Sequence, residues 1–364
     1  MAQRYKEIET IDQLLEETKV NGRLEYCAFQ DLDFTKVEEG ALSSIKFEYC
    51  IFMGCNIKGL SSNIGDSCVC FPSIEKPYNL FKSRLYSPSE LYGMVDEKRR
   101  FDDVVYQHYL QKGKFSDDIS ETLARSLHDH SILNALRDFL SQYDEKDVVA
   151  IMGGHAMLRT EPDYCKVVFI AKRLTEVGKL LVSGGGPGAM EATHLGAWMA
   201  GRDDCEVQDA LRLLSVAPTY KDEQWFQSAL AVIEKYPQTK YKSLGIPTWL
   251  YGHEPSTPFA THIAKLFENA LREDELLTIA KGGIVYSPGS AGTKQEIFQD
   301  AVQNHYLTFG YASPMVFLGV EYWSQTMPVY KLLKALSEQQ RYKNLLLSLT
   351  DDVDDVVAIL CDYY

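Results

Sequence analysis

Three stretches of sequence decide the fold, and each combines a short apolar run, a glycine-rich turn and the start of a helix. They are VVAIMGGH at residues 148–155, LLVSGGGPGAME at 180–191 and IVYSPGSAGTKQE at 284–296. Helical patterns follow all three stretches. Strands that alternate with helices of this length indicate a parallel sheet covered by helices on both faces. We therefore expect an α/β fold with a doubly wound, Rossmann-like parallel sheet over residues 146–340.

The same region contains further strand and helix patterns. Strands are predicted at 179–183, 211–217, 248–251, 284–287 and 315–319, and helices at 162–177, 189–201, 261–280 and 292–306. Beyond the sheet, acidic residues at 351–355 precede the apolar run 356–360. Acidic side chains favour the first turn of a helix because they interact with its dipole. Residues 341–364 are therefore predicted to form a helical tail that ends in an acid-capped helix.

The first 85 residues follow a different pattern, in which large apolar residues recur every five positions. The period includes Leu24, Phe29, Phe34, Leu42, Phe47, Phe52 and Ile57, with Cys27, Cys50 and Cys55 two places before three of them. This spacing resembles the pentapeptide-repeat pattern of a β-helix, although stacked repeats usually need more copies to bury a core. An ordinary small β-rich domain with short strands is the interpretation that we favour, and the β-helix is the alternative. We expect a β-rich accessory domain with pentapeptide-like spacing at 1–85.

A helical connector is expected between the two domains, over residues 86–145. Ser87 and Pro88 provide a capping side chain and a first-turn proline, and a helical pattern follows at 91–109. A second helix is predicted at 117–143 because apolar residues recur there at helical spacing.

Composition limits the partners of this protein. The 364 residues include 37 Lys and Arg against 51 Asp and Glu, a net charge of −14. An acidic surface repels phosphate backbones, so binding of nucleic-acid polymers is disfavoured. Apolar runs stay well below the roughly 18–20 residues that cross a bilayer, and the start lacks a signal-peptide core. The eight cysteines are too dilute for a disulfide scaffold. We expect a cytoplasmic protein with reduced thiols, no membrane partner and no metal site.

The two longer glycine turns have the chemistry of an anion site. Glycines let the backbone approach a phosphate, and the following helix begins with unpaired N–H groups and a positive dipole end. The turn at 184–188 is a weak dinucleotide fingerprint, and it lacks the Lys-Ser or Lys-Thr of a P-loop. In the turn at 288–296, Thr293 and Glu296 could instead form a capping box that only satisfies the helix N-terminus. Two such turns in one sheet favour a shared anion pocket.

The run GGGPGAME followed by PGSAGTKQE resembles the paired GGGxxGxM and PGGxGTxxE signatures of the LOG family, formerly described as lysine decarboxylases. The larger bacterial branch, the pyrimidine/purine nucleotide 5′-monophosphate nucleosidases, is also similar at 153–155 and 254–258. The resemblance covers about residues 145–330. It implies a hydrolase that cleaves the N-glycosidic bond of nucleoside 5′-monophosphates such as AMP, giving a free base and ribose 5-phosphate. It also implies a homodimer or a higher homo-oligomer.

The resemblance implies roles for particular residues. A carboxylate near the anomeric carbon can stabilise the oxocarbenium-like transition state and orient water, and Glu296 is expected to do this. Arg272 is expected to pair with the phosphate or the departing base through planar, bidentate contacts. The other substrate- and phosphate-binding residues implied are Gly184, Gly185, Gly186, Gly188, Met190, Gly289, Ser290, Gly292, Thr293, Gly154, His155 and Glu254. Hydrolysis of this kind needs no metal and no organic cofactor.

The chain departs from the family pattern at several positions. Ser290 replaces a glycine, Gln295 replaces the first Glu of a common pair, and Glu273 stands where a Lys follows the family's Arg. These differences bear on substrate preference and turnover more than on the fold. They leave open a second hypothesis, a non-catalytic nucleotide sensor whose N-terminal domain carries the output. A pyridoxal-phosphate-dependent decarboxylase is disfavoured because no lysine has a recognisable Schiff-base setting.

Overall fold

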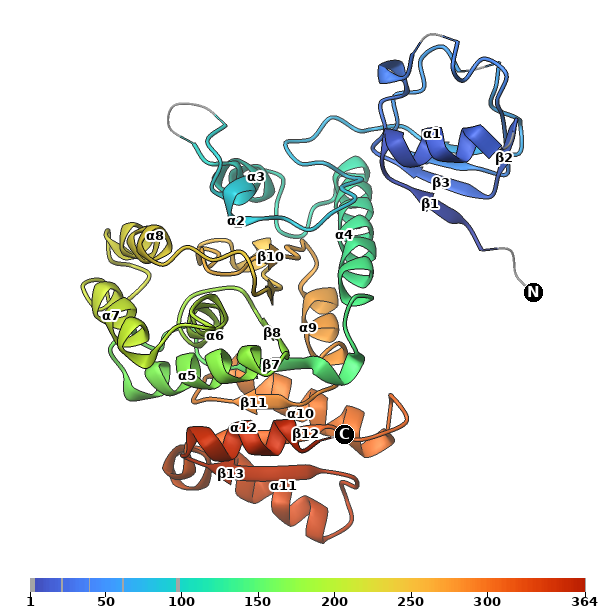
Figure 1. Cartoon of the computed structure of the whole chain (residues 1–364). Helices are drawn as coiled ribbons and strands as arrows, with labels where there is room; N and C mark the ends of the chain where they lie inside the picture. Colours follow the sequence, from blue (N-terminus) through green and yellow to red (C-terminus); the bar gives the residue numbers. More distant parts are fainter. Residues whose placement is uncertain (1–3, 21, 39, 61, 96–98, 364) are drawn as a thin grey trace. The chain divides into compact units, whose positions relative to one another are not determined.

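The structure, a computed structural model, divides into two compact units (Figure 1). It describes residues 4–20, 22–38, 40–60, 62–95 and 99–363. The N-terminal unit comprises Met1–Leu85 and Asp103–Asp138, and the α/β unit comprises Tyr86–Asp102 and Phe139–Tyr364. The region expected to form a connector, 86–145, is therefore shared between the two units and is not a body of its own.

The N-terminal unit is built on short parallel strands. Its four-stranded sheet has the order β1 (Lys6–Ile8), β3 (Cys27–Gln30), β5 (Ile51–Met53) and β6 (Val69–Phe71), and its second sheet pairs β2 (Arg23–Glu25) with β4 (Lys46–Glu48). All of these pairings are parallel. Successive passes of the chain therefore stack on one another as coils, and α1 (Ile11–Val20) packs beside the first of them.

The five-residue period marks the side chains that fill the inside of these coils. Leu24 lies opposite Phe47 and Phe29 opposite Phe52 in the parallel registers, and the Phe29 and Phe52 rings stack with centroids 4.8 Å apart. Phe34 and Leu42 are buried in the same cluster, and Ile57 packs against it. The arrangement corresponds to the stacked-coil interpretation, because parallel strands in register place equivalent residues directly above one another.

The helices before the main sheet differ from their predicted boundaries. The helix expected at 91–109 is replaced by two, α2 (Pro88–Leu91) and α3 (Phe101–Gln111), and the chain between them includes Gly93. Ser87 and Glu90 form a capping box at the start of α2, as the capping pattern predicted. The helix predicted at 117–143 is α4 (Ile119–Leu140).

One carboxylate holds the helical part of the N-terminal unit together. Glu121 on α4 is fully buried and accepts hydrogen bonds from Lys76 Nζ at 2.8 Å and Arg125 Nε at 2.9 Å. His108 Nε2 lies 3.0 Å from the same carboxylate. Burial alone raises the pKa of this group, but its hydrogen-bonding partners outweigh burial and lower the pKa of Glu121 to about 2.

The α/β unit contains a seven-stranded sheet in which every pairing is parallel. Its order is β10 (His262–Ile263), β9 (Ser243–Gly245), β8 (Leu180–Ser183), β7 (Val148–Met152), β11 (Ile284–Tyr286), β12 (Pro314–Leu318) and β13 (Leu346–Thr350). The chain moves outward from β7 through β8, β9 and β10, then returns to the other side of β7 with β11. This reversal confirms the predicted doubly wound, Rossmann-like α/β fold.

Helices connect and cover these strands. They are α5 (Pro162–Glu176), α6 (Ala189–Trp198), α7 (Asp204–Leu214), α8 (Trp225–Lys235), α9 (Asn269–Thr278), α10 (Ala291–Tyr306), α11 (Val329–Glu338) and α12 (Val353–Cys361). One hydrophobic cluster joins α5, α6, α7, α8 and α12 to the central strands, whereas α10 packs against α9. The strands β7, β11 and β12 are buried along their whole length, as expected where helices cover a parallel sheet.

Three predicted elements of this unit were wrong. The strand predicted at 211–217 is the end of α7, which starts with a capping box between Asp203 and Glu206. A short apolar run fits both a buried strand and a buried helix turn, and here the helical start decided. The strand predicted at 248–251 is a 3₁₀ turn, Trp249–Tyr251, and the real strand is β9. The helix predicted at 261–280 is shorter, because β10 precedes α9.

The C-terminal segment also differs from its prediction as a helical tail. The acid-capped helix is present as α12, where the Asp352 carboxylate accepts hydrogen bonds from the backbone N–H groups of Asp354 and Asp355. The segment before it forms β13, which extends the sheet beside β12. Because α12 packs on α5, this end of the chain belongs to the α/β unit.

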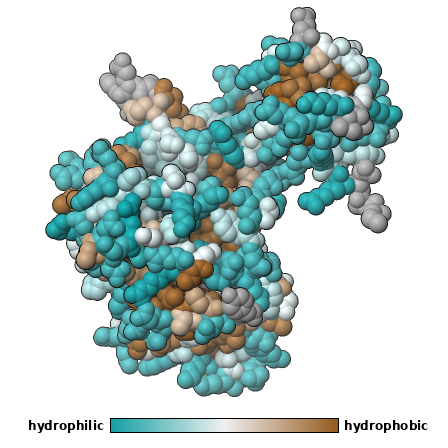
Figure 2. All heavy atoms as spheres, in the orientation of Figure 1, coloured by the Kyte–Doolittle hydropathy of each residue, from teal (hydrophilic) through white to brown (hydrophobic). Residues whose placement is uncertain are grey.

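The visible surface of each unit is dominated by hydrophilic residues, with hydrophobic atoms in smaller groups (Figure 2). Among the described residues, no helix combines the length and the apolar character needed to cross a membrane.

Candidate functional site

Three loops meet where the strand order reverses. β7 lies between β8 and β11, so the turns that follow these three strands leave the same edge of the sheet. The Gly154 N–H donates to the Pro288 carbonyl at 3.0 Å, and the Gly154 carbonyl accepts from the Ala189 N–H at 3.1 Å. Both glycine turns therefore flank the loop after β7. Open α/β sheets bind ligands in the crevice at this topological switch point.

Glycines are required at two places where the loops touch. Gly188 has φ of +70°, and a Cβ there would overlap the backbone of Gly154 and His155. A Cβ on Gly289 would overlap the Thr293 hydroxyl and lie 3.1 Å from the Gly154 nitrogen. Larger residues would therefore push the three loops apart.

The second turn leads into α10 without a side-chain cap. Ser290 is the N-cap residue, yet no side chain in the described part of the chain caps the helix N-terminus. Thr293 and Glu296 therefore do not form the capping box that was the alternative interpretation. Ser290 and Gly292 are exposed, and Gly292 has no neighbour within 4 Å of its Cβ position. The first N–H groups of a helix lack partners within it, and together with the dipole they attract anions.

Glu296 lies on the second turn of α10 and is only 7% exposed. Within the described part of the chain, no group donates a hydrogen bond to its carboxylate. Burial raises the pKa of Glu296 to about 7, with Arg272 opposing the shift and the Glu273 carboxylate adding to it. This side chain therefore exists in both protonation states near neutral pH, which is typical of acid–base residues in active sites.

Arg272 connects the first glycine turn with Glu296. It lies on α9, is 9% exposed, and donates from Nε to the Ile246 carbonyl at 2.9 Å. Its Nη2 contacts Gly184 so closely that a Cβ on Gly184 would overlap it, and Met190 covers the same glycine. The guanidinium is thus fixed beside the backbone of the turn after β8.

Glu273 follows Arg272 and is buried with it. Its Oε1 accepts a hydrogen bond from Arg272 Nη1 at 2.6 Å. Its Oε2 is buried and has no hydrogen-bond partner among the described residues. Arg272 is therefore the cation that interacts with two buried carboxyl groups, those of Glu273 and Glu296. These three side chains together carry a net negative charge when both carboxyl groups are ionised.

Glu254 and His155 extend the site on the other side of the first turn. A Cβ on Gly186 would lie 3.7 Å from Glu254 Oε2, and Glu254 Oε1 lies 3.8 Å from His155 Nε2. The His155 side chain is 43% exposed, so solutes can reach it. Gly185 instead packs against the end of β9: its carbonyl accepts from the Thr257 N–H at 2.8 Å, and its φ is +72°.

Two buried groups near the crevice were not identified as functional from the sequence. Glu191 on α6 is fully buried and forms an ion pair with Arg159 at 2.5 Å. Asp300 accepts a hydrogen bond from the Tyr286 hydroxyl at 2.7 Å, and burial raises its pKa to about 7. One sequence signal could have identified Asp300 as a candidate. It lies four residues after Glu296, which places both side chains on the same face of the helix.

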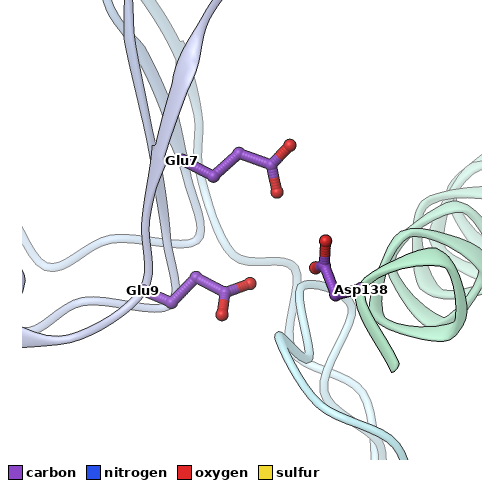
Figure 3. Close-up of side chains that lie close together, drawn as sticks. All are labelled: Glu7, Glu9 and Asp138. Carbon is purple, nitrogen blue, oxygen red and sulfur yellow. The ribbon is translucent and has the colours of Figure 1, made fainter. Parts of the chain in front are cut away.

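Three carboxylates also converge in the N-terminal unit, from the end of β1 and from α4: Glu7, Glu9 and Asp138 (Figure 3). Their oxygen atoms lie within 4.8 Å of one another. Burial, followed by the like charges of Asp138 and Glu7, raises the pKa of Glu9 to about 7. Among the described residues, this is the group with the spacing of a metal site, and it belongs to a different unit from the crevice.

Comparisons with known proteins do not assign this chain to a family. No protein-family model and no curated protein matches the sequence. Similar solved structures include a molybdenum cofactor binding protein from the phototrophic bacterium Rippkaea orientalis, with 13% identity, a TM-score of 0.38, and coverage of 59% of this chain and 94% of that one. Another is the Moco carrier protein of Chlamydomonas reinhardtii, with 15% identity, a TM-score of 0.37, and coverage of 59% and 96%. A likeness at this level says nothing about ligand or activity.

Proposed function

We propose that the α/β unit hydrolyses the N-glycosidic bond of nucleoside 5′-monophosphates, releasing a free base and ribose 5-phosphate. The observation that carries this proposal is the buried, ionisable carboxyl group of Glu296. It lies with Arg272 beside two glycine turns at the switch point of a doubly wound sheet. This combination supplies an anion cradle and an acid–base group in one crevice, which is the chemistry the LOG-like motifs imply.

The phosphate is assigned to the start of α10. Gly289, Ser290, Gly292 and Thr293 present backbone N–H groups there, and no side chain of the described residues caps them. Because the glycines at 289 and 292 have no side chain, a phosphate can approach the backbone there. The acidic surface of the protein disfavours long nucleic acids but leaves room for a small anion in this local positive field.

Bond cleavage would depend on Glu296. As the C1′–N bond breaks, positive charge develops on the ribose, and the ionised carboxylate stabilises it. Glu296 would then take a proton from the attacking water as the C1′–O bond forms, and this proton would reach the nitrogen of the departing base. Arg272 would offset the charge of the phosphate or the base through its guanidinium, whose Nη2 lies beside Gly184.

Product analysis tests the proposal. Purified protein is incubated with AMP, GMP, CMP and UMP, and free base is followed by chromatography. Glu296→Gln should lower the rate about 10²–10⁴-fold, the usual contribution of general-base catalysis. Glu338→Gln, an exposed glutamate at the end of α11, should not change it. Equal rates in wild type and Glu296→Gln would refute the role of this carboxyl group.

A non-catalytic nucleotide sensor is the second candidate. The observation that favours it is Glu273, which replaces the family's lysine and occupies Arg272 Nη1 at 2.6 Å. That pairing could leave Arg272 able to bind a phosphate but too neutralised to assist the departing base. Binding of mononucleotides without base release, in wild type and Glu296→Gln alike, would establish the sensor.

A cytoplasmic location and a homodimer or larger homo-oligomer complete the proposal, since mononucleotides are cytoplasmic metabolites and the resembling family assembles this way. Light scattering of the full chain measures the assembly. A monomer at all concentrations would rule out that part without affecting the proposed reaction.

A further inference from the structure

A pocket of about 180 Å³ lies beside the crevice in the α/β unit. It is bounded by the loop after β7, by Pro187 and Gly188 at the start of α6, and by the segment between α7 and α8. Pockets that hold a whole small ligand are typically about 300–1,000 Å³. This pocket is therefore the right size for one part of a ligand, with the remainder lying in the adjoining crevice.

The walls of this pocket include three aromatic side chains. His155, Tyr220 and Trp225 all line it, and the rings of His155 and Tyr220 meet edge to face with centroids 6.5 Å apart. Trp225 is buried, whereas Tyr220 is partly exposed on its loop. Such surfaces stack on planar rings, and base–aromatic stacking tolerates different bases because each has a π-face.

The carboxylate at the floor of the pocket is neutralised by an ion pair. Glu191 lines it, but both carboxylate oxygens accept hydrogen bonds from Arg159, at 2.9 Å and 2.5 Å. Arg159 is occupied in turn by the Ser228 hydroxyl and by backbone carbonyls. Lys221 is the one cationic side chain among the described lining residues, and it is exposed. At the floor a phosphate would meet a compensated carboxylate, whereas an uncharged ring can lie against the His155 and Tyr220 rings.

The pocket is continuous with the proposed site. His155 lines the pocket with its ring and approaches Glu254 with Nε2 at 3.8 Å, and Glu254 borders Gly186. Gly188 lines the pocket and also contacts Gly154, the residue that bonds to the turn before α10. A ligand with its phosphate at α10 could therefore cross the Gly154–His155 loop into the pocket.

We propose that this pocket binds the planar base of the mononucleotide, with Tyr220 as the stacking residue, so that the pocket sets the base preference. The assignment rests on the proposed function for the substrate class. It places the two ends of the ligand on different features: the phosphate on the N-terminus of α10, and the base between His155, Tyr220 and Trp225.

Equilibrium binding tests the assignment. AMP and ribose 5-phosphate are titrated by calorimetry into full-length Glu296→Gln protein, in which turnover does not consume the ligand. Adding Tyr220→Ala should weaken AMP binding about 5- to 150-fold, the usual effect of removing one base-stacking ring. Binding of ribose 5-phosphate should stay within about twofold, because it has no base. Tyr306→Ala removes an exposed tyrosine of α10 outside the pocket and serves as the matched control.

Two further variants distinguish the loss of the aromatic ring from misfolding of the protein. Tyr220→Phe keeps the ring and should bind AMP like the parent, and Tyr220→Leu keeps the apolar bulk but should bind AMP as weakly as Tyr220→Ala. Unchanged AMP binding in both Tyr220→Ala and Tyr220→Leu would overturn the proposal. Equal weakening of AMP and ribose 5-phosphate would also overturn it, since it would place the phosphate in the pocket.

The same variants separate this proposal from the proposed function. Release of base with KM values that do not depend on Tyr220 would refute the pocket assignment and keep the hydrolysis. AMP binding that depends on Tyr220, without base release by the wild type, would refute the hydrolysis and keep the pocket as a base-binding site.

Discussion

Two buried carboxyl groups, one in each unit, have opposite surroundings. In the N-terminal unit, Glu121 is surrounded by Lys76, His108 and Arg125, and its pKa is lowered to about 2. In the α/β unit, Glu296 shares a single nearby arginine with Glu273, and its pKa is raised to about 7. A fully paired buried charge serves the structure, whereas an under-paired one can exchange a proton at neutral pH. The comparison supports the proposal that the crevice is the reactive part of the chain.

The two units differ in the topology of their strand ends. In the N-terminal unit each strand stacks on the strand of the preceding coil, and side chains at every fifth position fill the interior. In the α/β unit, neighbouring strands β7 and β11 lead to connections that leave in opposite directions. The gap between those connections exposes backbone N–H groups and strand ends to a ligand.

Replacing the paired carboxylate should have the largest effect on stability. Glu121→Gln should destabilise the N-terminal unit by about 3–5 kcal/mol, because its cationic neighbours would lose a buried counter-charge. All four tryptophans, Trp198, Trp225, Trp249 and Trp323, lie in the α/β unit. Urea unfolding should therefore shift when followed by far-UV circular dichroism and remain unchanged when followed by tryptophan emission.

The exposed Glu16 on α1 provides the matched control for this variant. Glu16→Gln should unfold at the same urea concentration as the wild type. If Glu121→Gln does so as well, the ion-pair network is not what holds this unit. The contribution of Glu121 should also fall in acid, since its lowered pKa stabilises the fold above about pH 4.5 and this stability is lost as pH falls towards 2.

Replacing the under-paired carboxylate should have the opposite sign. The raised pKa of Glu296 means that the folded state favours the protonated form. Its stabilising effect is complete below about pH 4.5 and is lost as pH rises through 7. Glu296→Gln resembles the protonated form, so at pH 8 it should be more stable than the wild type by up to about 3 kcal/mol. Tryptophan-detected unfolding at pH 4.5 and pH 8 measures this, and a loss of stability at pH 8 would contradict it.

Changing the neighbour of Arg272 should move the pH dependence of catalysis. With ionised Glu296 as the base, kcat/KM for AMP should rise as pH passes about 7 in the wild type. Glu273→Lys replaces a like charge by an opposite one, so this rise should occur at lower pH. Asp274→Lys makes the same charge change on an exposed neighbour and should shift the profile far less. Identical profiles for both variants would show that Glu273 does not control Glu296.

The smallest expected effect concerns the acidic group of the N-terminal unit. Glu9 has a raised pKa and is only partly buried beside Glu7 and Asp138 (Figure 3). Its stabilising protonation is lost as pH rises through about 7, so Glu9→Gln should raise the melting temperature at pH 8 and not at pH 4.5. The gain should stay below about 1 kcal/mol, because solvent screens half-exposed charges. Equal shifts at both pH values would exclude this electrostatic origin.

Much of the α/β unit could be predicted because its signals are local. The strand predicted at 148–152 matches β7, and the turn and helix patterns after it reproduce α5 and α10 within a few residues. The glycine turns could be placed at one edge because parallel strands share that edge. The strand prediction failed at 211–217, where a run of apolar residues is compatible with two periods and the capped start of α7 selects the helix.

The motifs named the residues of the candidate site but did not predict its electrostatics. Glu296 and Arg272 could be named from the motifs, yet their burial could not. The Glu191 partner, Arg159, lies 32 residues away in the chain, and no sequence pattern joins the two. The pocket around Tyr220 likewise comes from three segments that only the fold brings together.

The sequence by itself determined which backbone turns can approach an anion and which carboxyl group stands next to them, because glycine conformation, helix starts and strand periodicity are properties of neighbouring residues. The tertiary structure decided which of the buried charges are paired, which carboxyl groups have a pKa near 7, and which distant segments line the pocket at Tyr220. Those properties depend on desolvation and on contacts between distant segments, and both arise only when the chain packs.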